Sequence, residues 1–468
     1  MAMRMKLSSV VAGCRVGELF WGEKCLELPA CLLYTRGGTA PNLTHDNLEL
    51  VEPAPIVAQV PLASLAEQQE VLEEYGEGFA KFIGLPDMLL LCTQYDPATP
   101  TPQGFTTSKT VSVWGSGGRM ELSPSRYVEL QRAVRPACYQ APAADDEGPT
   151  ASSKRERRGV DRTLAFLDAC LLAHHTHPEL SSVGVLGTVQ GGALLAERVR
   201  SARFTAARAV DGFLVSGLSQ RQCGEGRPGT ATRSRILRAV IAELPPDKPR
   251  MVCGVGRPDR VLRCAALGVD LFEGHFPFLV TERGGALHFS YDWETGAALG
   301  DVAGDEGDDA GGSAIPEVTQ EEQEEDEEED EEEEDDVRIP TRFEMNLREE
   351  RFRGDLSPLL PGCPCYTCAH HSRAYLHHLL ATRELLAGVL LSIHNVTRYH
   401  GFFAALRGAL RRGPPALARL RAAVLAAAPP PPLSSSPGAP PPFPPCPPPP
   451  LTVDSPLPPL ATGVEGGR

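Results

Sequence analysis

The sequence predicts an α/β protein built on a parallel sheet. Short runs of apolar and β-branched residues recur at intervals of roughly 15 to 40 residues, and helical patterns follow the first three of them. The runs cover 183–189, 213–215, 251–255 and 269–272, and the helical patterns cover 193–204, 232–243 and 258–267. Strand–helix alternation of this kind is typical of a parallel sheet with crossover helices. Over this length it fits either an eight-stranded barrel or a doubly wound open sheet.

Glycines follow the carboxyl ends of two predicted strands, in Gly191-Gly192 and in Gly254-Val-Gly256. Sites of barrel proteins lie at the carboxyl ends of the strands, so these loops are candidate site loops. The second loop lacks the third glycine in register that a dinucleotide fingerprint requires.

Three cysteines lie within six residues, at Cys363, Cys365 and Cys368, and His394 follows 26 positions later in an apolar helical stretch. A closed tetrahedral set of four N and S ligands is typical of one structural Zn²⁺. The alternative is unpaired or disulfide-bonded cysteines. The ten other cysteines stand singly and no apolar signal segment lies near Met1, as expected of a reduced cytosolic protein. Four histidines compete for the fourth ligand position: His370, His371, His377 and His378.

This Cys-x-Cys-x2-Cys-x25-His spacing resembles the zinc site of the tRNA-guanine transglycosylase family. Four more segments resemble family motifs, in the family's order: Trp114-Gly-Ser-Gly-Gly118, Gly187-Thr-Val-Gln-Gly-Gly192, Lys248 to Gly256 and Gly268-Val-Asp-Leu-Phe272. The resemblance covers roughly Lys6 to Arg412, apart from an acidic insert. It implies a (β/α)8 TIM-type barrel with an inserted zinc-binding subdomain near the C-terminus.

The residues that the family uses for chemistry are altered. Family members exchange a guanine base in tRNA, which requires a carboxylate nucleophile and a second carboxylate that handles the purine. By resemblance, Glu273 replaces the nucleophilic Asp, Gly115 replaces the second Asp, and Pro136 replaces an Asp of the pocket. We therefore expect no catalytic residue and a degenerate base pocket. Its members are Gly115, Gln190, Gly191, Gly192 and Glu273.

The resemblance thus implies a non-catalytic subunit of a heterodimeric enzyme that exchanges guanine for queuine at the anticodon wobble position. Its partners would be a catalytic subunit and tRNA, and whether homodimers also form stays open. The family implies the cytoplasm and the surface of the mitochondrial outer membrane, and no run of eighteen uncharged apolar residues predicts a transmembrane helix. The alternatives are an active transglycosylase that uses Glu273 and a zinc-stabilised scaffold that binds RNA or protein.

The net charge of −16 is dominated by one segment. Between Asp301 and Asp336 there are 21 acidic residues and no Lys or Arg, which leaves 40 acidic against 45 basic residues elsewhere. A run this dense in one charge cannot bury a core and is expected to be disordered. From Pro429, 17 of the last 40 residues are proline, which predicts a tail with polyproline II character.

Four regions are therefore expected along the chain. They are the main part of the barrel (1–300), a disordered acidic insert (301–340), the zinc-binding subdomain with the final barrel helix (341–415) and an Ala/Pro-rich, mostly disordered tail (416–468). We also expect the partner contact in the third region. There an apolar face (374–391) precedes an aromatic cluster (399–403) and a basic edge of Arg407, Arg411 and Arg412, placed nearer the tRNA.

Overall fold

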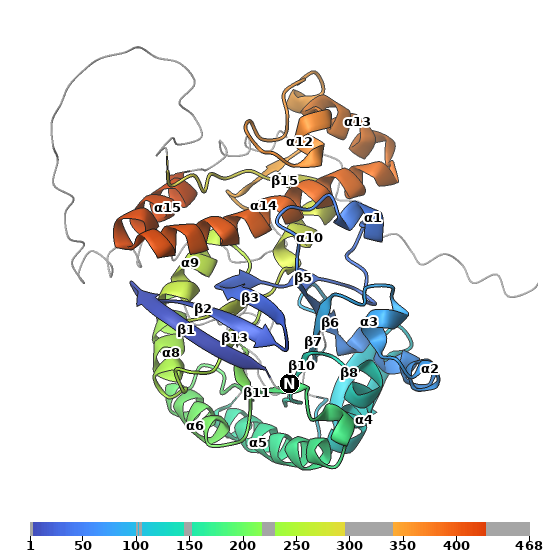
Figure 1. Ribbon diagram of the computed structural model, residues 1–468, viewed down its shortest axis with the longest axis vertical. Coiled ribbons are helices and arrows are strands. Elements are labelled where there is room, and N and C mark those ends of the chain that lie inside the picture. The colour runs from blue at the N-terminus through green and yellow to red at the C-terminus, as the bar shows by residue number, and fades with distance from the viewer. Residues whose placement is uncertain are drawn as a thin grey trace, which may run out of the picture. The chain divides into compact units, whose positions relative to one another are not determined.

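Parallel strands close into a barrel in the computed structural model (Figure 1), which describes residues 3–99, 102, 105–144, 152–217, 230–294 and 340–426. The acidic run 321–336 and the tail from Pro429 lie outside these residues. The strands are β4 (Ala30–Cys31), β5 (Leu33–Tyr34), β6 (Val57–Pro61), β7 (Leu89–Thr93), β10 (Cys138–Gln140), β11 (Gly184–Val189), β12 (Gly212–Val215), β13 (Arg250–Val252) and β14 (Leu271–Phe272).

The barrel closes through β4 and β5, which are two halves of one strand. Only Leu32 separates them, and its N–H donates to the carbonyl of Phe272 at 2.9 Å. β4 pairs with β14, and β5 pairs with β6, all in parallel. The order β4-β14-β13-β12-β11-β10-β7-β6-β5 follows the chain around the barrel, which excludes the doubly wound alternative.

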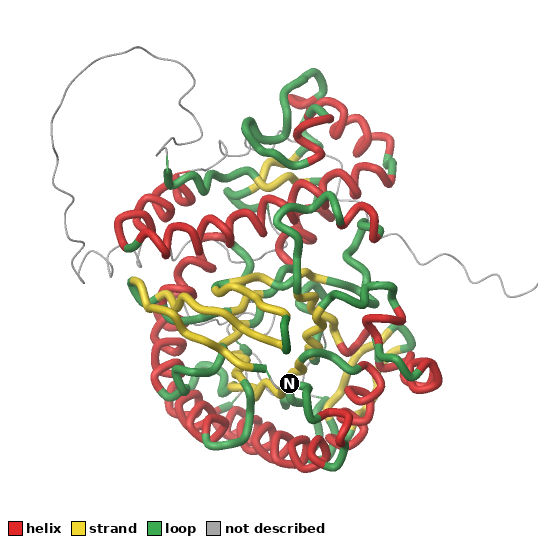
Figure 2. The backbone as a smooth tube through the Cα atoms, viewed as in Figure 1, coloured by secondary structure: helices red, strands yellow, loops and turns green. Residues whose placement is uncertain are grey.

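A ring of helices surrounds these strands (Figure 2). The ring includes α4 (Pro124–Val134), α5 (Ser153–His175), α6 (Leu195–Ala206), α8 (Thr230–Ala242) and α9 (Pro258–Ala266). The three expected helical patterns correspond to α6, α8 and α9, and the four expected strands to β11 through β14. The sequence-based elements of this half of the barrel are confirmed.

The barrel interior has an apolar lower layer and a polar upper layer. In the lower layer, Leu91, Leu186, Leu214, Met251 and Leu271 pack with an antiparallel sheet at the amino ends of the strands. That sheet consists of β1 (Arg4–Val11), β2 (Cys14–Trp21) and β3 (Lys24–Leu28). Side chains two positions apart on a strand share a face, so the next inward residues form the upper layer. They are polar and buried: Gln59, Thr93, Gln140, Thr188 and Glu273.

Short elements follow the first strands. They are α1 (His45–Leu48), η1 (Leu62–Ser64), η2 (Ala66–Gln68), α2 (Gln69–Tyr75), α3 (Phe79–Phe82), the hairpin β8 (Val111–Gly115) and β9 (Gly118–Leu122), and η3 (Pro178–Leu180). The C-terminal region begins after β14. It contains α10 (His275–Glu282), β15 (Gly285–Leu287), β16 (Glu344–Asn346), η5 (Glu350–Phe352), α12 (Tyr366–His370), α13 (Arg373–Thr382), α14 (Leu385–Arg412) and α15 (Pro414–Ala426).

The long helix α14 joins this region to the barrel. The expectation that residues 399–403 of this helix form part of the partner surface is wrong. Tyr399, Phe402 and Phe403 are buried in the main core, where Phe403 lies 5.5 Å from Phe272 between ring centroids. They are core residues because one face of α14 covers the barrel. The arginines of the basic edge are also paired within the chain: Arg407 and Arg411 both form ion pairs with Glu27 of β3.

The expected boundary at residue 415 falls inside α15, which runs on to Ala426. None of the helices in the described ranges is long and apolar enough to cross a membrane.

Candidate metal centre

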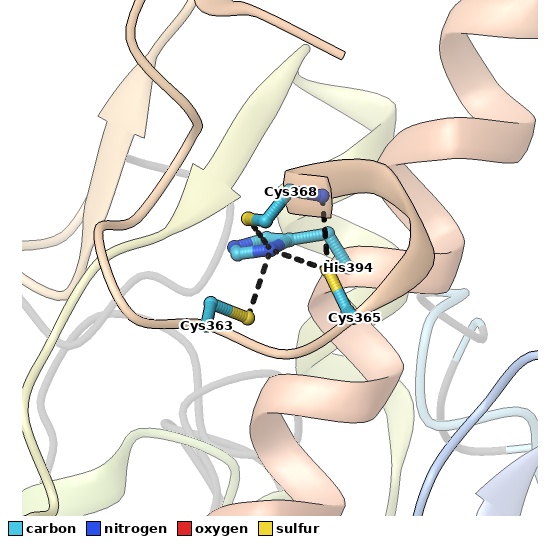
Figure 3. Close-up of side chains that lie close together, drawn as sticks. All are labelled: Cys363, Cys365, Cys368 and His394. Atoms are coloured by element: carbon cyan, nitrogen blue, oxygen red, sulfur yellow. Dashed lines mark hydrogen bonds between the residues drawn. The ribbon is translucent and has the colours of Figure 1, made fainter. Parts of the chain in front are cut away.

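Cys363, Cys365, Cys368 and His394 converge on one point (Figure 3). Their ligand atoms all lie within 4.8 Å of one another. The Nδ1 atom of His394 lies 3.9, 3.4 and 3.3 Å from the sulfurs of the three cysteines in chain order. Zn–S bonds near 2.3 Å and a Zn–N bond near 2.0 Å in a tetrahedron give an S···N edge of about 3.5 Å. The four residues therefore fit a tetrahedral metal ion.

Local structure explains how three nearby thiols point the same way. Cys365 is the N-cap of α12, and its sulfur accepts the N–H of Cys368 at 3.4 Å. Cys368 lies on the first turn of the same helix, and Cys363 approaches from the loop before it. The hydroxyl of Thr367 donates to the carbonyl of Leu390 at 2.6 Å, which holds α12 against α14. The turn thereby presents its sulfurs to the helix that carries His394.

A second layer of contacts fixes the histidine. Its Nε2 atom lies 3.0 Å from the carbonyl oxygen of Leu287 in β15, which leaves Nδ1 for a metal. The next residue, Asn395, accepts the N–H of Leu287 at 2.7 Å and donates to Thr281 and Gly285 at 2.9 and 3.1 Å. Sequence reasoning missed both contacts, because they join segments more than a hundred residues apart.

Proton affinities in the group reflect the crowding of three thiols. Burial alone would lower the pKa of His394, but its contacts with Cys363 and Cys368 raise that pKa to about 9. Hydrogen bonds with Cys365 and Cys368 lower the pKa of the Cys363 thiol, while hydrogen bonds with its two neighbours raise the pKa of Cys365. Three sulfurs this close cannot all ionise without a cation among them, and a divalent metal would supply one.

The competing histidines lie elsewhere. The Nδ1 atom of His377 lies 2.9 Å from the carbonyl oxygen of Leu347. His370 packs on Tyr366, and His371 stacks on Tyr375, with ring centroids 4.6 and 5.3 Å apart. The geometry of the group selects His394 as the fourth candidate ligand.

Glu273 directly follows β14, and its carboxylate is engaged in hydrogen bonds. It accepts the side-chain N–H of Gln59 at 2.9 Å and the backbone N–H of Gly254 at 2.6 Å. The Nδ1 atom of His275 lies 3.8 Å from the same carboxylate. Only 3% of Glu273 is exposed, so the carboxylate belongs to a buried polar network. Gln59 gave no signal in the sequence.

Gly115 is the last residue of β8, directly before the hairpin turn, and lies against Glu67 of η2. A Cβ atom at Gly115 would lie 2.5 Å from Oε1 of Glu67. The same oxygen accepts the N–H of Gly117 at 2.6 Å, and the other carboxylate oxygen accepts the hydroxyl of Ser116. A carboxylate from another segment therefore occupies the space beside Gly115. The sequence pattern did not point to Glu67.

The Gly-Gly loop after β11 also packs on its own chain. The amide of Gln190 donates to the hydroxyl of Thr163 in α5 at 2.6 Å. Gly192 has φ of 55°, and a Cβ atom there would lie 2.1 Å from Oε1 of Glu156. These glycines are needed because the backbone turns where other groups approach closely. Arg198 is fully buried and donates to the carbonyls of Gly192, Val189, Ser216 and Gly217, which ties the loops after β11 and β12 together.

Comparison with known proteins extends these observations over most of the chain. A relative from Danio rerio named queuine tRNA-ribosyltransferase accessory subunit 2 is 47% identical over 418 residues, which cover 87% of this chain and 95% of the relative. The protein with the same name from Xenopus tropicalis is 45% identical, over 89% of this chain and 98% of its own length. The one from Homo sapiens is 43% identical, over 87% of this chain and 96% of its own length. The family model described as queuine tRNA-ribosyltransferase matches residues 11–427. The chain therefore belongs to the queuine tRNA-ribosyltransferase family, the transglycosylase family that its motifs resemble.

Proposed function

We propose that this chain is a non-catalytic subunit of a queuine tRNA-ribosyltransferase. It would bind the catalytic subunit as a heterodimer and help to position tRNA for exchange of guanine for queuine at the wobble position. The names of the relatives support an accessory role. The observation that carries the proposal is Glu273. Its carboxylate oxygens accept hydrogen bonds from Gln59 and Gly254. A nucleophilic carboxylate needs an oxygen that can approach the substrate, and both oxygens of Glu273 are engaged within the protein.

The rest of the candidate base pocket supports the same proposal. Gly115 supplies no carboxylate, and the neighbouring Glu67 is bonded to the turn that it stabilises. Gln190 is directed to Thr163 in α5. A pocket whose polar groups are paired with one another has few left for a purine or its leaving proton. We infer that the barrel acts as a scaffold.

We further propose that Cys363, Cys365, Cys368 and His394 hold one Zn²⁺ in a structural role. Thiolates and a neutral imidazole are the ligands that zinc prefers, and four protein ligands leave no open position for a substrate. The ion would fasten α12 to α14. The contacts of His394 and Asn395 with β15, and of Asn395 with Thr281 in α10, would extend that restraint to these two elements.

The surface of the zinc-binding region is our candidate for the partner contact. Several of its apolar and aromatic side chains remain exposed: Leu356, Tyr366, Tyr375, Leu385 and Leu386. Exposed aromatic side chains are enriched at protein–protein interfaces, and Tyr366 and Tyr375 both contact the ring of His371, which places them side by side. This placement replaces the cluster at 399–403, which is buried. Tyr366→Ala with Tyr375→Ala should weaken co-purification with the catalytic subunit, whereas Phe204→Ala, on the outside of α6, should not.

The experiment that tests the function compares the chain alone, the catalytic subunit alone and the two together. Incorporation of labelled queuine into tRNA should be absent with this chain alone and should increase when it joins the catalytic subunit. Exchange by the purified chain alone would favour the active-enzyme alternative. A stable chain that neither binds the catalytic subunit nor changes its activity would favour an unrelated scaffold.

For location, we propose the cytoplasm, with any association with the mitochondrial outer membrane made through a partner. Cell fractionation with and without the catalytic subunit checks this. An outer-membrane fraction that is independent of the partner would contradict it.

A further inference from the structure

Three side chains stack on the outer face of the β8–β9 hairpin. Trp114 and Arg119 are direct cross-strand neighbours. Phe105, from the segment before β8, packs edge-to-face on Trp114 with ring centroids 5.3 Å apart. The guanidinium of Arg119 lies over the Phe105 ring, 5.1 Å from its centroid. Neighbouring residues of a strand point to opposite faces, and Val113, next to Trp114, is fully buried. The stack therefore lies on the outer face of the hairpin.

The stack belongs to the rim of the barrel's carboxyl end. The hairpin follows β7, and its turn is bonded to Glu67, which lies just after β6. Loops at this end carry the sites of barrel proteins. The position is therefore one from which a side chain can meet a substrate that approaches the barrel mouth.

The segment that carries Phe105 is held in place at two points. The hydroxyl of Ser112 donates to the carbonyl of Phe105 at 3.0 Å. From α5, the guanidinium of Arg162 donates to the carbonyl of Thr106 at 3.2 Å. An anchored aromatic ring loses little conformational entropy when a flat ligand stacks on it. Phe105 is nevertheless 40% exposed, which costs hydrophobic stabilisation unless something covers it.

The surrounding charges favour an anionic occupant. The guanidinium of Arg119 lies over the Phe105 ring, and that of Arg162 is bonded to the carbonyl of the adjacent Thr106, so two cationic groups lie at this segment. Of the nearby acids, Glu121 forms an ion pair with Arg119, and Glu67 accepts hydrogen bonds from the hairpin turn. Aromatic rings flanked by Arg are typical of surfaces that stack single-stranded bases and bind the adjacent phosphates.

We propose that Phe105, Trp114 and Arg119 form a stacking platform for an unpaired base of tRNA. This inference rests on the proposed function, because it takes tRNA as the ligand of the assembled enzyme. The platform binds the RNA and takes no part in base exchange. It gives this chain its own contact with the RNA, separate from the buried network around Glu273.

The test uses the full chain assembled with its catalytic subunit and measures affinity for two probes: a tRNA transcript and a fully paired RNA duplex of similar length. Phe105→Ala should weaken tRNA binding about 5- to 160-fold, the range for loss of one base stack, and should change duplex binding little. Phe105→Trp should retain most of the affinity. The matched control is Phe204→Ala, which removes another exposed phenylalanine, 49% exposed on α6.

The outcomes separate this inference from the proposed function. If the complex assembles and exchanges queuine normally, but Phe105→Ala binds tRNA as the native protein does, the platform is wrong and the function stands. If Phe105→Ala abolishes assembly with the catalytic subunit, the stack is a protein contact and the inference fails. Equal thermal stability of the variants excludes unfolding as the cause of a lost affinity.

Discussion

The imidazole of His394 is joined to the carbonyl oxygen of Leu287 by a contact of 3.0 Å, so the candidate metal ligand on α14 is also bound to strand β15. The adjacent Asn395 accepts the N–H of the same residue. Leu287 thus has both its backbone groups paired with consecutive residues of one helix. The metal group and the two-stranded β15–β16 sheet are therefore parts of one hydrogen-bonded unit, and loss of the metal should destabilise that sheet.

Cys365→Ser should abolish stable zinc binding. The serine hydroxyl is a poor zinc ligand, and zinc affinity contributes directly to local folding. Elemental analysis of the purified protein should fall from about one zinc per chain to near zero. Cys25→Ser, at a partly exposed thiol outside the group, is the control and should keep its metal. Full zinc content in the Cys365 variant would refute the ligand assignment.

Asn395→Ala should destabilise the chain without removing the metal ligands. The substitution leaves the buried N–H of Leu287 without its acceptor and breaks the bonds to Thr281 and Gly285. Losses of this kind cost about 2 to 4 kcal/mol in the free energy of unfolding. Denaturant unfolding measures the change, and zinc content should remain that of the native protein. Asn47→Ala, in the exposed helix α1, should change stability little.

Restoring carboxylates at the family positions should not create an active enzyme. Glu273→Asp shortens a side chain that is already bonded to Gln59 and Gly254. Gly115→Asp would place a second carboxylate against Glu67, because even a Cβ atom there lies 2.5 Å from that side chain. We expect no queuine incorporation by the isolated double variant. Robust exchange by it would show that two acids suffice and would contradict the scaffold proposal.

His400 should make the chain sensitive to acid. Burial, with a smaller contribution from Arg407, lowers its pKa from 6.5 to about 4. Because the pKa of His400 is lower in the folded than in the unfolded protein, the unfolded protein binds the proton more readily. The free energy of unfolding is therefore unaffected by this group above pH 6.5 and decreases as the pH falls towards 4. At pH 5 the loss is about 2 kcal/mol. His400→Gln should lose correspondingly less stability between pH 7 and pH 5 in urea unfolding; equal losses would contradict the assignment.

Deletion of residues 321–336 should leave zinc content, thermal stability and association with the catalytic subunit unchanged. A run with 15 acidic residues in 16 contributes no apolar surface to a core or an interface. Substitution of the run by a Gly/Ser segment of equal length is the control for its charge. Loss of association on deletion, but not on substitution, would show that the length of this connection matters.

Much of the fold and the metal group could be predicted from the sequence because both depend on local patterns. Apolar runs followed by helical periods predicted β11 through β14 and the helices after the first three, since strand and helix periods are set by neighbouring residues. The Cys363–Cys368 cluster was visible because its three thiols lie within six residues. The choice between barrel and open sheet needed the family resemblance, and the pairing of β4 with β14 then closed the barrel.

Only the tertiary structure decided what the remaining residues do. Tyr399, Phe402 and Phe403 look like an exposed cluster in sequence, yet they are buried because α14 lies across the barrel. The carboxylate of Glu273 is hydrogen-bonded to Gln59, which lies 214 positions earlier. The backbone of Leu287 is hydrogen-bonded to His394 and Asn395. Hydrogen bonds between distant segments leave no periodic signal along the chain. The sequence determined which groups exist, and packing determined which of them remain free to act.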